Sequence, residues 1–203
     1  MIVLDIETSG TDFLKCGICQ IGAIDLETLE EFFEEGRIDD EDEIVNIGKD
    51  KLACLEVLGK TEEELRDNTK QSQKELLSKF FKWIEKRSTN FFLCHNPVFD
   101  LAFLNNKASK YGIERTFHHR SFDLHTVAQM KFYELYHLFS IKDNEVKMGL
   151  KNILNFCGIE DNRKFHNSLE DAKITAECFS RLLEGKNIFP EYSKFEIPDY
   201  LKR

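Results

Sequence analysis

Residues 3–10 read VLDIETSG, an apolar stretch interrupted by two acidic residues. Its apolar side chains alternate onto both faces, which is typical of a strand at the centre of a sheet. Side chains two positions apart in a strand point to the same face, so Asp5 and Glu7 project together. Because neighbouring buried carboxylates repel one another, either one is protonated, a basic side chain pairs with them, or a divalent cation lies between them. Lys15 is the only basic residue among residues 1–24, which favours the cation.

The order of the predicted elements indicates an α/β fold. Two more strands follow the first, at 18–24 and 31–38, with gaps of hairpin length. Beyond them, helices alternate with strands at 90–94 and 120–122. We therefore expect a mixed five-stranded sheet flanked by helices, with three antiparallel strands and then two strands parallel to the first. Helices are predicted at 51–58, 61–67, 72–86, 97–111, 123–139, 149–157 and 168–183.

Composition indicates a packed globular protein. The chain has 203 residues, of which 41% are hydrophobic and 18 are Phe. We expect residues 1–184 to form one domain and residues 185–203 to form an extended tail that packs on its surface. No apolar run approaches the length of a membrane helix, and no signal peptide is visible. The six cysteines lie singly in apolar segments, which favours reduced thiols and a cytoplasmic location.

The net charge of −9 is unevenly distributed along the chain. Residues 1–67 hold 20 acidic and 6 basic side chains, whereas residues 68–203 hold 17 acidic and 22 basic ones. We interpret the acidic run at 39–43 as a solvated loop. A polyanionic substrate can therefore approach the basic remainder, provided that divalent metals offset the acidic site.

A second polar stretch, residues 95–100, reads HNPVFD and follows an apolar strand. It lies at the carboxyl end of that strand, where ligands gather in open α/β sheets. Asn96 is expected to cap the next helix, with Pro97 at its first position. Asp100 falls one turn into the helix, where a carboxylate also complements the helix dipole. Each of these residues has a sufficient structural role by itself.

A third stretch, residues 166–172, reads HNSLEDA. Ser168 and Asp171 have the spacing of a capping box, which predicts that Ser168 caps the last helix. Asp171 also continues the inward-facing stripe of that helix. His166 lies on the loop before the cap, where an imidazole can reach a site and titrate near neutral pH.

Together, the three stretches resemble the exonuclease motifs of the DEDD superfamily, in its DEDDh branch. Residues 5–10 match the first motif, 95–100 the second and 166–171 the third. His166, where a sister branch carries Tyr, selects the DEDDh branch. The resemblance extends from residue 1 to about residue 184, with the motifs in the family's order. It implies the ribonuclease H-like fold, which agrees with the predicted strand order.

The resemblance implies a two-metal mechanism. Asp5, Glu7 and Asp171 would hold one Mg²⁺ or Mn²⁺ ion, while Asp5 would also contact a second ion that Asp100 supports. Oxygen ligands suit these hard cations and argue against zinc. His166 would act as the general base, and the products would be nucleoside 5′-monophosphates released from a single-stranded 3′ end.

The first and second motifs also supply candidates for binding the terminal nucleotide. These are the backbone groups of Thr8, Ser9 and Gly10 and the side chain of Asn96. Phe13 could stack on a base, but among so many Phe residues it is expected to lie in the core.

Other readings of the sequence predict different sites. Cys16 and Cys19 form a C-x-x-C pair, a signal for a redox or zinc site. Residues three apart in a strand face opposite sides, however, and the other four cysteines are isolated. The histidines between residues 118 and 137 lack carboxylates at a matching spacing, so we interpret them as surface residues. A non-catalytic nucleic-acid binding module with the same fold remains an alternative, although all four carboxylates and the His are present.

Spacing alone does not distinguish DNA from RNA, because recognition of the 2′-hydroxyl depends on pocket geometry. The chain looks most like the proofreading enzymes associated with DNA polymerases, so DNA is the expected substrate. RNase T and oligoribonuclease, both usually dimeric, are the alternatives. A DNA polymerase and a second copy of the chain are therefore the candidate partners, and we favour an enzyme that acts alone.

Overall fold

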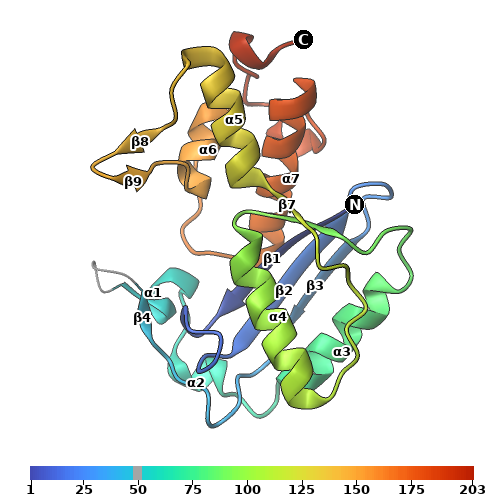
Figure 1. Cartoon of the computed structure of the whole chain (residues 1–203). Helices are drawn as coiled ribbons and strands as arrows, with labels where there is room; N and C mark the ends of the chain where they lie inside the picture. Colours follow the sequence, from blue (N-terminus) through green and yellow to red (C-terminus); the bar gives the residue numbers. More distant parts are fainter. Residues whose placement is uncertain (48–51) are drawn as a thin grey trace.

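The computed structural model of the protein describes residues 1–47 and 52–203. At its centre lies a five-stranded sheet with the order β3-β2-β1-β6-β7 (Figure 1). β1 is antiparallel to β2 and parallel to β6, β2 is antiparallel to β3, and β6 is parallel to β7. The predicted mixed sheet is thereby confirmed. The strands are β1 (Ile2–Thr8), β2 (Ile18–Asp25), β3 (Glu31–Glu35), β6 (Phe92–Cys94) and β7 (Phe122–Asp123).

Helices cover both faces of this sheet, because β1 sends alternate apolar side chains into two cores. Leu4 packs with the apolar faces of α3 and α4 on one side. Val3 packs with α5, α6 and α7 on the other. Asp5 and Glu7 share the parity of Val3 and therefore project toward the α7 side. The helices are α1 (Cys54–Leu58), α2 (Glu62–Leu65), α3 (Gln73–Ile84), α4 (Pro97–Tyr111), α5 (Leu124–Tyr136), α6 (Leu150–Phe156) and α7 (Ser168–Glu184).

Two small sheets depart from the predicted elements. The predicted helix 51–58 starts only at Cys54, because β5 (Leu52–Ala53) pairs with β4 (Asn46–Ile47); position 51 lies outside the described residues. The predicted helix 123–139 ends at Tyr136, where His137 takes a left-handed conformation. The chain then forms a hairpin of β8 (Ile141–Lys142) and β9 (Glu145–Val146) that the sequence patterns did not predict. Its two turn residues both have positive φ, as a tight hairpin turn requires.

The C-terminal segment is not extended as predicted. It contains two short 3₁₀ helices, η1 (Pro190–Tyr192) and η2 (Asp199–Leu201). Phe189 and Leu201 are buried in the same core as α7, which fastens the segment to the domain. In the part of the chain that the structure describes, no helix is both long and apolar enough to cross a membrane.

The cysteines do not form a site. All six are free and buried. Cys16 packs in the core beneath α3 and α4, whereas Cys19 packs in a separate cluster with Leu58 and Leu65. This separation agrees with the expectation that the C-x-x-C residues face opposite sides.

Candidate active site

The site is built around the carboxyl end of β1. Glu7 is 8% exposed and Asp5 is partly buried, so both carboxylates lie largely out of water. Parallel pairing of Val3 with Leu93 places the end of β6, and the polar stretch that follows it, beside Asp5. The first two motifs therefore meet at one edge of the sheet, as their positions after two parallel strands predict.

Gly22 allows α7 to reach this edge. It pairs with Asp5 across β1 and β2, and a Cβ on it would come within 2.2 Å of the Leu169 backbone nitrogen. The first turn of α7 therefore lies directly on the backbone of β2. Nearby, the Gln20 side-chain oxygen accepts a 3.2 Å hydrogen bond from the Ser168 backbone N–H. These two contacts from β2 bring Asp171, one turn into α7, over the carboxylates of β1.

Asn167, not Ser168, caps α7. The Asn167 side-chain oxygen accepts hydrogen bonds from the backbone N–H groups of Leu169 and Glu170, both at 3.1 Å. The Ser168 hydroxyl is buried and has no hydrogen-bond partner among the described residues. The predicted capping box of Ser168 and Asp171 is therefore wrong, because the neighbouring Asn takes the cap and Ser168 packs against β2. The Asp171 carboxylate is left available for the site.

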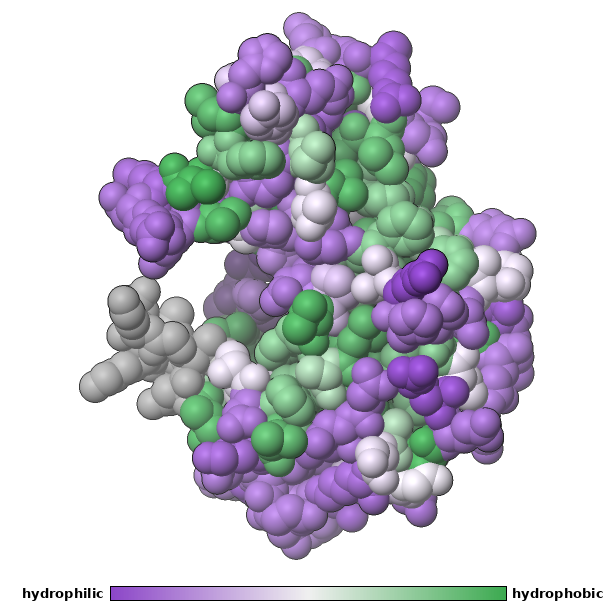
Figure 2. Space-filling view, viewed as in Figure 1, coloured by the Kyte–Doolittle hydropathy of each residue, from purple (hydrophilic) through white to green (hydrophobic). Residues whose placement is uncertain are grey.

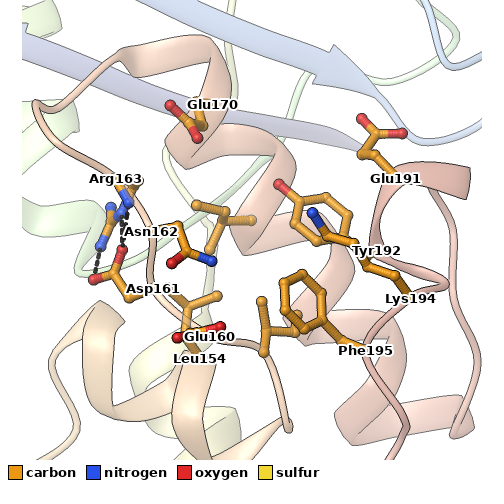
Figure 3. A pocket seen from close by; sticks show the side chains of 12 residues that line it. Leu154, Glu160, Asp161, Asn162, Arg163, Glu170, Glu191, Tyr192, Lys194 and Phe195 are labelled. Carbon is orange, nitrogen blue, oxygen red and sulfur yellow. Dashed lines mark hydrogen bonds and ion pairs between the residues drawn. The ribbon is translucent and has the colours of Figure 1, made fainter.

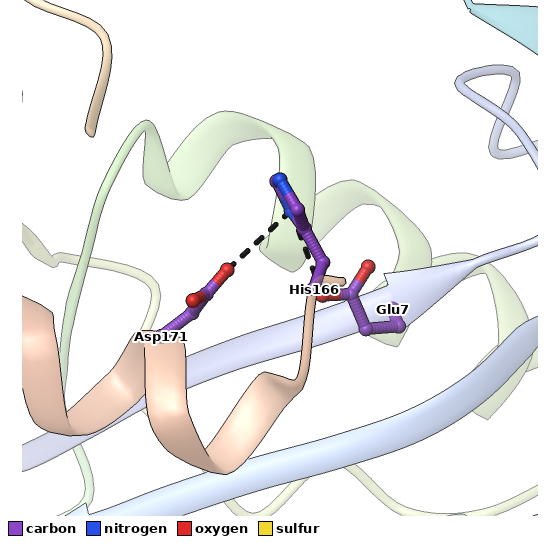
Figure 4. Close-up of side chains that lie close together, drawn as sticks. All are labelled: Glu7, His166 and Asp171. Carbon is purple, nitrogen blue, oxygen red and sulfur yellow. Dashed lines mark ion pairs between the residues drawn. The ribbon is translucent and has the colours of Figure 1, made fainter. Parts of the chain in front are cut away.

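His166 approaches both carboxylates from the loop before α7 (Figure 4). Its Nδ1 lies 3.5 Å from Asp171 Oδ2 and 3.9 Å from Glu7 Oε1, with the ring about half exposed. One ligand atom from each of these three residues lies within 4.8 Å of the others. The His166 backbone N–H donates to the Val57 carbonyl at 2.9 Å, so α1 holds the loop in place.

The loop that carries His166 borders a hollow in the surface. Figure 2 shows the molecule hollowed beneath the β8–β9 hairpin, with hydrophilic side chains at the back. A pocket of about 230 Å³ adjoins His166 and is lined by Glu56, Val57, Asp161, Arg163 and Lys164. The imidazole is therefore accessible to a ligand while its backbone is fixed.

Asp100 and Asn96 come from the start of α4. Asp100 is 3% exposed in the first turn. Asn96 has a left-handed backbone with φ of 65°, and its exposed side chain makes no capping hydrogen bond, so the predicted side-chain cap is wrong. Instead, the Asn96 backbone N–H donates to Asp123 Oδ1 at 3.1 Å. The left-handed turn leaves the side-chain amide of Asn96 available to a ligand.

The backbone of the first motif is less available than predicted. Ser9 is fully buried, its N–H donates to Gly17, its carbonyl accepts from Val45, and its hydroxyl donates to Glu43. The N–H, carbonyl and hydroxyl of Ser9 are therefore all engaged within the chain, and its contact with a nucleotide stays a prediction. The buried Thr8 hydroxyl donates to the Gly10 carbonyl at 2.6 Å.

Phe13 is 39% exposed and touches Phe103 only edge-on, with ring centroids 6.5 Å apart. Its expected place in the core is therefore wrong. Phe13 follows β1 on the turn that leads to β2, at the same edge of the sheet as the site.

Burial and mutual repulsion disfavour ionisation of the site carboxylates. Burial, together with the charges of Glu7, Asp171 and Asp100, raises the pKa of Asp5 well above its ordinary value. Burial, with the charges of Asp171 and Asp100, raises the pKa of Glu7 to about 8. Burial alone raises the pKa of Asp100 to about 8. The carboxylates of the cluster therefore outnumber the positive charges near them.

Arg163 is the site residue that the sequence analysis missed. Its Nη1 donates to Asp171 Oδ1 at 2.6 Å, and the Arg163 side chain is only 7% exposed. The guanidinium lowers the pKa of Asp5 and of Glu7, against the larger effect of burial. Its position in a loop shows no periodicity that would point it inward. Basic pairing, one of the options that the sequence left open, is thus partly realised from outside residues 1–24.

The donor set fits a hard divalent cation. Glu7 and Asp171 offer carboxylate oxygens that converge with His166, and Asp5 lies near enough for its charge to interact with theirs. Buried carboxylates in excess of the nearby cations are the groups that Mg²⁺ or Mn²⁺ would stabilise in their charged form. The thiols lie in separate cores and are not part of this set.

Comparisons with known proteins identify the family to which the chain is similar. A family model described as "RNase_T: Exonuclease" matches residues 2–179. A DNA polymerase III of the PolC type from Thermotoga petrophila is 27% identical over 188 residues, which span 90% of this chain but only 12% of that protein.

Solved structures share the fold. The nuclease domain of 3'hExo, a DEDDh family member bound to rAMP, has a TM-score of 0.65 at 15% identity and covers 98% of this chain and 95% of its own. The complex of E. coli ExoI with single-stranded DNA, in a zinc-bound form, has a TM-score of 0.65 at 17% identity, over 91% of this chain and 41% of that one. The ribonuclease H-like exonuclease fold that the family resemblance implies, and with which the predicted strand order agrees, is confirmed.

Proposed function

The chain belongs to this exonuclease family, in its DEDDh branch, and from this membership we propose that it removes nucleotides from the 3′ end of single-stranded DNA. As a 3′–5′ exonuclease domain it is a metal-dependent phosphodiesterase. The observation that carries the proposal is the convergence of Glu7, His166 and Asp171 within 4.8 Å, beside the partly buried Asp5 and the buried Asp100. The product would be a nucleoside 5′-monophosphate.

Each side chain has a proposed role. Asp5, Glu7 and Asp171 would hold one Mg²⁺ or Mn²⁺ ion, and Asp5 with Asp100 would hold a second. Bound there, the two ions would stabilise the attacking and leaving oxygens of an in-line displacement at phosphorus. His166 would accept the proton of the attacking water at Nε2, because its Nδ1 already faces Asp171 Oδ2 at 3.5 Å.

The terminal nucleotide would lie against the mouth of the site. The Asn96 side chain is exposed and free of capping bonds, so we propose that it contacts the nucleotide. Backbone groups of Thr8, at the end of β1, and of Gly10, in the turn that follows, would complete the contact. Phe13, half-exposed at the same edge, would stack on a base.

Two features of the relatives support DNA over RNA. The PolC-type relative is a DNA polymerase, and the ExoI neighbour holds single-stranded DNA. The second candidate, an exoribonuclease of the RNase T or oligoribonuclease kind, is favoured by the 3'hExo neighbour, which is bound to rAMP and matches nearly end to end. We propose a DNA polymerase and a second copy of this chain as candidate partners, and we still favour an enzyme that acts alone.

Side-by-side digestion separates these candidates. The protein is incubated with labelled single-stranded DNA, single-stranded RNA and duplex ends, each with Mg²⁺ or Mn²⁺. We expect single-stranded DNA to be shortened fastest. Faster loss of RNA would replace DNA by RNA as the substrate, and no release from any strand would favour the non-catalytic binding module.

His166→Ala tests the proposed base. We expect kcat to fall by about 10²–10⁴-fold, the usual contribution of a general base, while Mn²⁺ still binds. His119→Ala, at an exposed position away from the carboxylates, serves as the matched control and keeps its activity. Unchanged turnover in His166→Ala would remove this residue from the mechanism.

Organisation and location complete the proposal. We assign catalysis to residues 1–184 and treat 185–203 as a C-terminal segment packed on that domain. The six free, buried thiols suit a reducing compartment, and we propose the cytoplasm.

A further inference from the structure

We propose that Arg163 is an internal counter-cation of the carboxylate site, which holds Asp171 in place without a divalent ion and weakens the binding of that ion. The inference rests on the proposed function, because it takes Asp171 as a metal ligand. It concerns a positioning residue: Arg163 would act through Asp171 and would not touch the substrate.

The guanidinium is held at both ends. Arg163 Nε and Nη2 donate to the two carboxylate oxygens of Asp161 at 2.9 and 3.0 Å. The remaining nitrogen, Nη1, donates to Asp171 Oδ1 at 2.6 Å. A planar guanidinium that makes a two-pronged pair has little freedom to rotate away. Its charge therefore stays beside Asp171 when another cation arrives.

Arg163 divides the two oxygens of Asp171 between two tasks. Oδ1 accepts from Arg163, whereas Oδ2 faces His166 Nδ1 at 3.5 Å. A cation held by Asp5 and Glu7 would therefore take Oδ2. It would bind a carboxylate whose charge is already shared with Arg163, next to a fixed positive charge. Both effects lower the affinity of the site for a divalent ion.

The surroundings of Arg163 keep it in this position. It forms a wall between the pocket beside His166 and a second cavity of about 240 Å³ under the C-terminal segment (Figure 3). In Figure 3, Asp161 and Arg163 pair on the side of that cavity opposite Tyr192. The ion pair is itself largely buried, with 13% of the Asp161 side chain exposed, so solvent screens it weakly.

The test measures Mn²⁺ affinity by calorimetric titration in the wild type and three full-length variants. Arg163→Met removes the charge at similar length, and we expect Mn²⁺ to bind at least about tenfold more tightly. Arg163→Lys keeps the charge, and we expect it to stay within about threefold of the wild type. Lys164→Met removes an exposed charge from the next position and should leave the affinity unchanged. Equal or weaker binding by Arg163→Met would overturn the inference.

Thermal unfolding supplies a second readout that does not depend on catalysis. In chelator, Arg163→Met should unfold at a lower temperature than the wild type, because Asp171 loses its only guanidinium partner among the described residues. With saturating Mn²⁺, most of this difference should disappear. An equal loss with and without Mn²⁺ would show a merely structural role and contradict the inference. Arg163→Gln provides a milder variant if Arg163→Met does not fold, because it also removes the charge, and the same direction is expected for Mn²⁺ affinity.

The outcomes also separate this inference from the proposed function. If the wild type binds Mn²⁺ and releases nucleotides but Arg163→Met binds no more tightly, only the role of Arg163 fails. If Arg163→Met binds Mn²⁺ and the wild type does not, the result would support Arg163 as the counter-cation. Absence of Mn²⁺ binding in every variant would remove the metal site and this inference with it.

Discussion

Two arginines with buried side chains form ion pairs with carboxylates of α7, and their surroundings differ. Arg181 and Glu177 form an ion pair at 2.9 Å with no exposure of either side chain. Backbone groups also hydrogen-bond the donors of Arg181 and the acceptor of Glu177 that the ion pair does not use, so the charges of this pair are matched. Arg181 donates to the carbonyls of Cys157, Tyr192 and Phe195, and Glu177 accepts from the backbone N–H groups of Ile188 and Phe189.

Arg163, near the other end of α7, has more carboxylates around it than its single positive charge can balance. It pairs with Asp161 and Asp171, and Asp171 in turn faces the carboxylates of Asp5 and Glu7. The balanced pair, Arg181 and Glu177, fastens the C-terminal segment to α7. The unbalanced cluster around Asp171 has more negative than positive charge. Buried charge that is fully matched indicates structure, and buried charge left in excess indicates a site for a cation.

The largest expected effect comes from breaking the balanced pair. Glu177→Ala leaves the Arg181 guanidinium buried without its carboxylate, which should lower the free energy of unfolding by about 3–5 kcal/mol. Nuclease activity per folded molecule should persist, because this pair lies outside the site. Denaturant titration measures the stability, and Glu184→Ala at an exposed position of the same helix is the control. A variant as stable as the wild type would contradict the structural role of the pair.

A smaller effect is expected where β2 supports α7. Gly22→Ala places a Cβ against the backbone of Ser168 and Leu169, so the first turn of α7 must shift. We expect a loss of about 1–3 kcal/mol in unfolding free energy. Because the shift moves Asp171 relative to β1, Mn²⁺ affinity should fall as well. Unchanged Mn²⁺ affinity in calorimetry would show that Asp171 does not depend on this contact.

The third prediction concerns the pH dependence of the unbalanced cluster. The raised pKa values of Glu7 and Asp100, both about 8, mean that the folded protein keeps protons that the unfolded chain releases. Their contribution to stability is full below about pH 4 and is lost as the pH rises through about 8. Without metal, unfolding free energy should therefore fall as the pH rises through this window, with a slope of about 1.4 kcal/mol per pH unit for each retained proton.

Thermal unfolding in chelator between pH 5 and pH 8.5 measures this slope. Glu7→Gln should flatten it, because the amide does not ionise. Glu170→Gln, at an exposed position in the first turn of α7, should keep the wild-type slope. A metal-free protein whose stability rises with pH across this range would contradict the charge deficit.

Sequence patterns predict most of the sheet but not the contacts between loops. The parity of Asp5 and Glu7 follows from strand geometry alone, and the order of strands follows from their spacing. A lone Gly at position 22 within an apolar strand is a sign of close backbone approach, but it does not say which element approaches. Two adjacent residues, Asn167 and Ser168, were both competent caps, and only packing on β2 decided between them.

Arg163 shows the limit most clearly. Its partners are Asp161, two residues away, and Asp171, which the fold of the α6–α7 connection brings near. No periodicity links these positions, because loops have none. The β8–β9 hairpin was missed for a related reason, since its strands are two residues each and too short to show alternation.

The central claim, that this site shortens nucleic acid from its 3′ end with a divalent metal, is tested by single-strand digestion with wild type and Asp5→Asn. A strand labelled at its 5′ end should yield a ladder that shortens one nucleotide at a time, only with Mg²⁺ or Mn²⁺. Asp5→Asn should lose this activity by about 10³-fold or more and remain folded, because removal of one charge relieves repulsion in the cluster. Internal cleavage, metal-independent cleavage, or undiminished activity in Asp5→Asn would contradict the account.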